Sequence, residues 1–114
     1  MALEVNGKTL ELDGNGNLVN TNDWDEDVAK ALAAADDTMG ELTQEHMDVL
    51  NYLRSEYIDN GGNQPMERAI NKDMGKIWGK KISSKDLYKL VPGAPRKQGN
   101  RIAGPPYVAR TGGD

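Results

Sequence analysis

The side chains of this chain that are best placed to do chemistry are its cations, whose spacing suits anion binding. Arg68, Lys72 and Lys76 recur every four residues, which puts three positive charges on one face of a helix. Lys80, Lys81 and Lys85 continue this set, and we call these six cations the basic face. The C-terminal segment adds Arg96, Lys97, Arg101 and Arg110. A cationic face of this kind binds either nucleic acid, as a helix-turn-helix reader does, or an acidic protein surface. The spacing alone does not choose between the two.

Residues suited to catalysis or metal binding are scarce. His46 is the only histidine and the chain has no cysteine, which excludes thiol nucleophiles, disulfides and thiolate zinc sites. We expect His46 to cap or pack a helix. The stretch DGNGN (13–17) lacks the final glutamate of a calcium loop, and neither glycine-rich phosphate-binding motif is present. The sequence therefore predicts no enzyme active site, no metal site and no cofactor.

The charges are divided unequally along the chain. Residues 1–67 hold 3 Lys/Arg against 15 Asp/Glu, whereas residues 68–110 hold 11 Lys/Arg against Asp73 and Asp86. This asymmetry favours an anionic partner for the second half, although mutual attraction of the two halves is an alternative explanation. No apolar run approaches the ~20 residues of a membrane helix, and no signal-peptide pattern follows Met1. We expect a cytoplasmic protein without a membrane partner.

Apolar periodicity predicts one domain over residues 1–95, with a β-hairpin in 1–20 and helices in 22–95. Asn6-Gly7 lies between alternating apolar residues and favours a type I′ hairpin turn. The third helix should face the core with the apolar residues that recur at helical spacing, which are Met66, Ala69, Ile70, Met74, Ile77 and Trp78. Caps or proline mark the expected helix starts, at Asn22 or Asp23, Thr43, Pro65 and Ser83. The predicted class is α+β, mainly α.

Residues 96–114, RKQGNRIAGPPYVARTGGD, have a composition that helix and strand both disfavour. They hold four glycines, two adjacent prolines and four cations against one acid. We therefore predict that this segment is a flexible C-terminal arm outside the domain.

Three stretches give the chain a family resemblance: LTQEHMDVLNYLRSEY (42–57), PMERAI (65–70) and LYKLVPGAPRKQGNRIAGPP (87–106). Together with NGKTLELDGNGNLVNTNDW (6–24), they resemble the DsrC/TusE family. That family is associated with dissimilatory sulfite reductase and with sulfur relay to tRNA thiolation. The resemblance implies a small helical bundle with an N-terminal β-hairpin, a helix-turn-helix-like core and a mobile C-terminal arm. In sulfur-carrying members the arm enters a partner and presents a cysteine that holds persulfide sulfur.

This chain departs from the family at the positions that carry sulfur. The resemblance places the arm-base cysteine at Asn100 and the penultimate cysteine at Gly113. Persulfide transfer uses a thiolate as nucleophile, and neither residue can supply one. The resemblance also implies the partner-binding residues of the arm, which are Arg96, Lys97, Gln98, Arg101, Ile102, Gly104 and Arg110.

Three functions remain open on the sequence. The favoured hypothesis is a non-catalytic, accessory or regulatory relative that docks on a sulfite reductase or a sulfurtransferase complex of the DsrEFH/TusBCD type without carrying persulfide. The alternative is a transcriptional regulator of sulfur genes that binds DNA through the basic face. The third is a carrier whose thiols were replaced by design.

Overall fold

The computed structural model describes residues 2–36, 39, 41–93 and 98–105, and it begins with a hairpin. Strands β1 (Ala2–Val5) and β2 (Lys8–Glu11) pair antiparallel, with Val5 opposite Lys8 beside the turn. Asn6 and Gly7 both have positive φ, 52° and 81°. A type I′ turn requires this conformation at both positions, so the hairpin prediction is confirmed.

The first helical segment differs from the prediction, because it is split in two. A 3₁₀ turn, η1 (Thr21–Asp23), precedes helix α1 (Glu26–Ala34), so the expected start at Asn22 or Asp23 is wrong. Asn20 caps the first piece, and the Asp25 carboxylate accepts from the Val28 amide at 2.9 Å to cap the second. Two caps in close succession satisfy the amides of two short segments and leave Trp24 extended between them.

Helix α2 (Gln44–Asp59) begins after the Thr43 cap, as predicted. His46 Nδ1 accepts from the Thr43 amide at 3.0 Å, and its Nε2 lies 2.9 Å from the carbonyl oxygen of Leu90. With Nδ1 as acceptor, Nε2 carries the proton and donates to Leu90. His46 therefore closes the capping box and ties α2 to the end of helix α4 (Ser84–Leu90), which is the structural role expected of it.

Helices α3 (Glu67–Trp78) and α4 (Ser84–Leu90) form the basic half of the molecule. The Ser83 cap is confirmed, and its hydrogen bonds lower the pKa of Asp86. α3 begins at Glu67 rather than at Pro65, with Met66 as its N-cap. Met66 and Ile77 are 49% and 57% exposed, so their predicted burial is wrong. α3 lies at the edge of the bundle and buries only a narrow stripe, formed by Ile70 and Met74.

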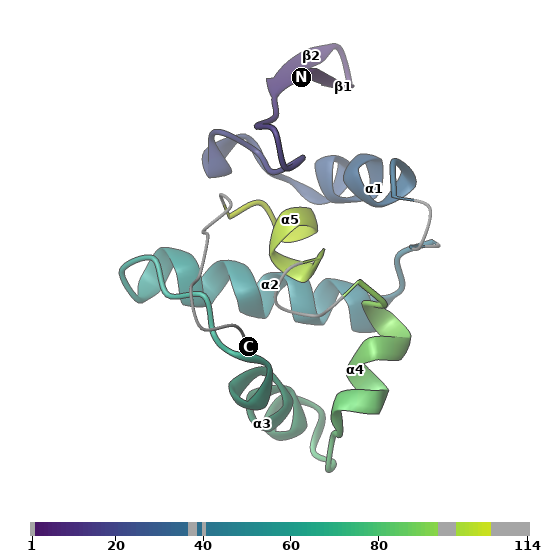
Figure 1. Cartoon of the computed structure of the whole chain (residues 1–114), viewed down its shortest axis with the longest axis vertical. Helices are drawn as coiled ribbons and strands as arrows, with labels where there is room; N and C mark the ends of the chain where they lie inside the picture. The colour runs from purple at the N-terminus through teal and green to yellow at the C-terminus, as the bar shows by residue number, and fades with distance from the viewer. Residues whose placement is uncertain (1, 37–38, 40, 94–97, 106–114) are drawn as a thin grey trace.

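The last described element, α5 (Gly99–Ala103), contradicts part of the predicted arm. Figure 1 shows α5 between α1 and α2, with α3 and α4 beyond α2 on the other side. Ile102 and Ala103 are fully buried, and Pro105 is also inside the fold. Tertiary packing overrides a composition that is poor for a helix. Residues 94–97 and 106–114 lie outside the described residues, so the boundary at 95/96 and the remainder of the arm stay predictions.

The core joins the hairpin to the helices. Leu10 and Leu18 contribute from the N-terminal segment, and Leu53 and Ile102 are fully buried where α2 meets α5. The structure is thus a small helical bundle with an N-terminal two-stranded sheet, and the predicted class, α+β and mainly helical, is confirmed.

Candidate functional site

The base of the C-terminal segment is held by a set of hydrogen bonds and an ion pair from distant parts of the chain. It centres on α5, whose Gly99 lies directly against α2. A Cβ atom built on Gly99 would stand 2.8 Å from Leu53 Cδ1, closer than real Cβ contacts. Glycine at this position therefore lets the α5 backbone touch the α2 side chains, and the burial of Ile102 follows from this close approach.

Three side chains from distant parts of the sequence hold the backbone where α5 ends. The indole Nε1 of Trp24 donates to the Ile102 carbonyl at 2.8 Å, and Arg54 Nη1 donates to the Ala103 carbonyl at 2.9 Å. The side-chain nitrogen Nδ2 of Asn17 donates to the Pro105 carbonyl at 3.2 Å. The last carbonyls of a helix lack partners within the helix, and buried ones must find donors elsewhere. We call Asn17, Trp24 and Arg54 the carbonyl clamp.

Arg54 links the members of the carbonyl clamp. Its guanidinium lies over the Trp24 ring, 4.4 Å from the centroid, and its Nη1 also donates to the Thr21 hydroxyl at 3.1 Å. Burial lowers the pKa of Arg54, because desolvation disfavours the charged form. Carbonyl oxygens and the π face of the indole compensate the half-buried cation. The guanidinium fork can stack and donate at once, which the ammonium of lysine cannot do.

Gly104 lies against the carbonyl clamp at a point where a side chain would not fit. Its φ is 103°, in the region that favours glycine, and it caps α5 by donating its amide to the Asn100 carbonyl at 3.0 Å. A Cβ atom there would lie 2.7 Å from Arg54 Nη1 and 2.9 Å from Trp24 Cδ1. Backbone conformation and space thus both require glycine.

Asp36, just beyond α1, holds the other end of α5. Arg101 forms an ion pair with its carboxylate, and Gln98 Nε2 donates to Asp36 Oδ2 at 2.8 Å. The Gly93 amide donates in turn to Gln98 Oε1 at 2.7 Å. The Asp36 side chain is only 11% exposed, so this ion pair is better shielded from solvent than the exposed pair between Lys80 and Glu45.

The residues predicted to bind a partner through the arm are therefore occupied within the fold. Gln98 is 3% exposed, Ile102 is fully buried, and Gly104 touches the carbonyl clamp. Arg101 keeps part of its surface but pairs with Asp36. Their side chains hold the base of the segment in place within this chain, and their contact with a partner stays a prediction. The other predicted arm positions, Arg96, Lys97, Arg110 and Gly113, lie outside the described residues.

Asn100, at the position matched to the arm-base cysteine, is also inside the protein. It is 3% exposed in the first turn of α5. Its burial leaves no open path by which a partner could reach the side chain in this conformation.

A cysteine placed at this position should be protected. We expect Asn100→Cys to react with a thiol reagent at least ~100-fold more slowly than Lys85→Cys, because α5 must open before the reagent can reach the sulfur. Labelling followed by mass spectrometry under native conditions would measure the ratio, with unfolded protein as the reference. Equal native rates would contradict the burial of this position.

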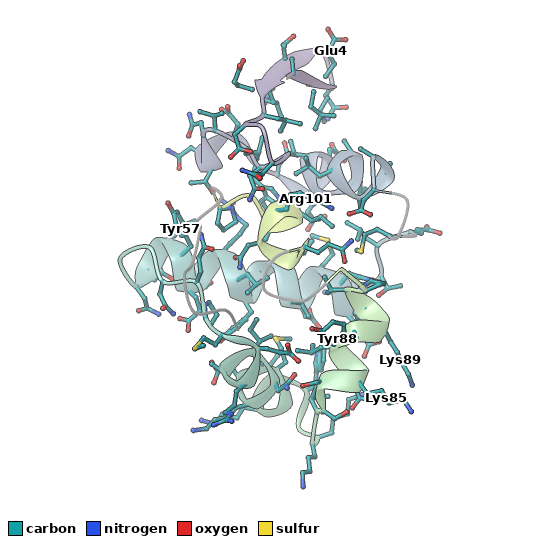
Figure 2. The ribbon with its side chains drawn as sticks, viewed as in Figure 1. Glu4, Tyr57, Lys85, Tyr88, Lys89 and Arg101 are labelled. Atoms are coloured by element: carbon teal, nitrogen blue, oxygen red, sulfur yellow. The ribbon has the colours of Figure 1, made fainter. Side chains whose placement is uncertain are left out.

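The cations predicted as one basic face form a surface apart from α5. Lys72, Lys76, Lys80 and Lys81 surround a groove at the end of α3, and Arg68 is exposed on the first turn of that helix. Figure 2 shows Lys85 and Lys89 projecting outward from α4, while Arg101 lies at α5 in the other half of the molecule. The structure thus brings Lys72, Lys76, Lys80 and Lys81 together, and Arg101 lies apart from them.

Metal and membrane sites were not predicted. Among the described residues, no group of three or more histidine, aspartate or glutamate side chains is arranged to hold a metal ion. None of the described helices is both long and apolar enough to cross a membrane.

Comparison with known proteins places the fold and the buried segment in one family. The family described as DsrC like protein matches residues 4–109. A protein named Sulfurtransferase TusE from Yersinia pestis is 35% identical over 105 residues, covering 91% of this chain and 94% of that protein. The chain therefore belongs to the DsrC/TusE family of sulfur-relay proteins, which confirms the resemblance found in the sequence.

Two solved structures show the same fold. The oxidized gamma-subunit of the dissimilatory sulfite reductase (DsrC) from Archaeoglobus fulgidus is 38% identical, with a TM-score of 0.88, covering 97% of this chain and 99% of that chain. The NMR structure of DsrC from Allochromatium vinosum is 41% identical, with a TM-score of 0.86 and the same coverage. These relatives support a connection with sulfur metabolism and give no support to the helix-turn-helix or DNA-binding predictions.

Proposed function

We propose that this protein is a non-catalytic member of the DsrC/TusE family that docks on a sulfite reductase or a sulfurtransferase complex without carrying sulfur. One observation carries the proposal: the chain keeps the family fold over nearly its whole length, yet its 114 residues include no cysteine. Relatives are named as a sulfurtransferase and as a sulfite reductase gamma-subunit. We place this action in the cytoplasm.

The missing cysteine thiols determine what the protein does once docked. Sulfur relay moves a sulfane sulfur from one thiolate to another, so donor and acceptor each need a sulfur atom of their own. Asn100 offers an amide and Gly113 a hydrogen atom. The protein therefore occupies the docking site of a true carrier, as an accessory or regulatory subunit, and limits how often that carrier reaches the enzyme.

The buried α5 helps to explain how docking survives the loss of the cargo. The carbonyl clamp contacts backbone atoms of residues 102, 103 and 105, and these contacts do not depend on the side chain at Asn100. The position of the backbone from Ile102 to Pro105 is thus kept without a cysteine. We infer that residues 106–114 and the basic face make the contacts with the partner.

The proposal predicts inhibition of sulfur transfer. A cysteine-containing DsrC or TusE from the same host would be loaded with persulfide and incubated with its sulfite reductase or sulfurtransferase complex. Adding this protein should slow transfer by roughly tenfold at an excess of tenfold over the carrier, if both bind with similar affinity. The same protein shortened to residues 1–105 should inhibit much less. Absence of binding to either complex, together with an unchanged transfer rate, would refute the proposal.

A further inference from the structure

The lysine groove at the end of α3 has a shape that follows from two glycines. It is lined by Lys72, Lys76, Lys80 and Lys81 together with Gly75, Gly79 and Ile82. A Cβ atom on Gly75 would lie 2.9 Å from the Lys80 carbonyl oxygen, so only glycine lets the chain fold back this tightly. Gly79, with φ of 67°, ends α3 and makes the reversal possible.

The groove is lined by an apolar side chain, Ile82, as well as by the lysines. Ile82 is half-buried and the four lysines are exposed, as expected of side chains whose methylene stems cover apolar surface while their ammonium groups stay in water. Such a groove suits a ligand with an apolar side chain flanked by negative charges.

The positive charge of the lysine groove is largely uncompensated. Within the part of the chain that the structure describes, Lys72, Lys76 and Lys81 form no ion pair. Lys80 approaches Glu45 at 3.9 Å, but both side chains are more than half exposed, so the pair is weak. The dipole at the C-terminal end of α3 favours cations in its last turn, which accounts for Lys76. It does not account for Lys72, one turn earlier.

Acidic residues limit the extent of this positive surface. Glu45 and Asp86 line a second depression on the other side of the Lys80–Ile82 loop, and Glu67 opens α3. A nucleic acid carries phosphates beyond the length of the groove and would meet these carboxylates. A short acidic segment of a protein can pair with the lysines and end before it reaches them.

We propose that the lysine groove binds an acidic, partly apolar segment of a partner protein. An apolar side chain of that segment lies against Gly75 and Ile82, and its carboxylates pair with the surrounding lysines. The groove deepens the proposed function, since it gives the sulfur-enzyme partner a stated chemistry, but its ligand preference can be measured without any sulfur enzyme.

The test is a titration of the full-length, ¹⁵N-labelled protein with a synthetic 12-residue peptide of glutamate and leucine. We expect amide shifts at Gly75, Gly79 and Ile82, with an affinity that falls as salt rises from 50 to 200 mM. The double variant Lys72→Glu/Lys76→Glu should weaken binding at least ~10-fold. Lys8→Glu/Lys30→Glu changes the net charge equally on the hairpin and α1, and should leave the affinity within about twofold. Circular dichroism would confirm that both variants fold.

Several results would overturn the proposal. These are no shift in the groove, equal weakening by both double variants, tighter binding of duplex DNA than of the peptide at the same salt, or the same shifts on self-association without peptide. Peptide binding in the groove, together with no binding to either sulfur-enzyme complex and an unchanged transfer rate, would leave this inference standing and refute the proposed function. If the variant Lys72→Glu/Lys76→Glu inhibited transfer as strongly as the unchanged protein, the proposed function would stand. The role of the lysine groove in binding the sulfur enzyme would then be refuted.

Discussion

Replacing Gly104 by alanine should lower the free energy of unfolding by about 3 kcal/mol or more. Positive φ at a residue with a Cβ costs about 1–2 kcal/mol, and here the added carbon would also lie 2.7 Å from Arg54 and 2.9 Å from Trp24. Relief of these contacts must move Arg54 away from the Ala103 carbonyl and lengthen a hydrogen bond that is now 2.9 Å. Urea unfolding followed by tryptophan fluorescence measures the loss.

Gly79 provides the matched control for this substitution. It also caps a helix with positive φ, 67°, but a Cβ atom built there meets no atom within 4 Å. Gly79→Ala should therefore cost only the backbone term, about 1 kcal/mol. The difference between the two variants isolates the steric requirement of the carbonyl clamp. Equal losses in both would show that the close approach at Gly104 is not essential to the fold.

The elements that could be predicted from the sequence are those fixed by neighbouring residues. Asn6-Gly7 determines its own turn, and Thr43 and Ser83 cap helices through hydrogen bonds that span three residues. Where local signals compete, the prediction was wrong by a few residues. Asn20 and Asp25 each cap a segment, and a rule that looks for one cap before one helix cannot anticipate two.

The candidate site could not be predicted in this way because its contacts are distant in sequence. The hydrogen bonds of the carbonyl clamp span 88, 78 and 49 residues, and the Asp36–Arg101 ion pair spans 65. The composition of residues 96–114 indicates a flexible segment, and locally it contains nothing that would hold a helix. The position of α5 is fixed by donors elsewhere in the chain. No motif in the sequence around these donors indicates that role.

The match of Asn100 to a carrier position is a prediction from the family resemblance, whereas the surroundings of Asn100 could not be predicted from the sequence. Asn100 could be matched to a cysteine position through the surrounding residues, yet its 3% exposure follows from the packing of Gly99 on Leu53. A position enclosed by its own domain is under packing constraints as well as chemical ones, so a small polar residue can replace a thiol there while the fold is kept.

Arg54→Ala should produce the second large effect, a loss of about 3 kcal/mol in the free energy of unfolding. A hydrogen bond from a charged donor contributes about 1.5–3 kcal/mol, and a cation over an indole adds about 0.5–2 kcal/mol. Truncation removes the donor of the Ala103 carbonyl and the cation over Trp24. Desolvation of the guanidinium, which also lowers its pKa, offsets part of the sum. Urea unfolding measures the result.

Two comparisons separate the carbonyl clamp from a general effect of losing a positive charge. Arg68→Ala removes an exposed arginine from α3 and should change stability by less than about 0.5 kcal/mol. Arg54→Lys keeps the charge but cannot stack on Trp24 while donating to Ala103, so it should recover less than half of the loss. If Arg54→Ala cost no more than Arg68→Ala, the end of α5 would be held by packing alone. The position of the backbone at Pro105 would then not depend on the clamp.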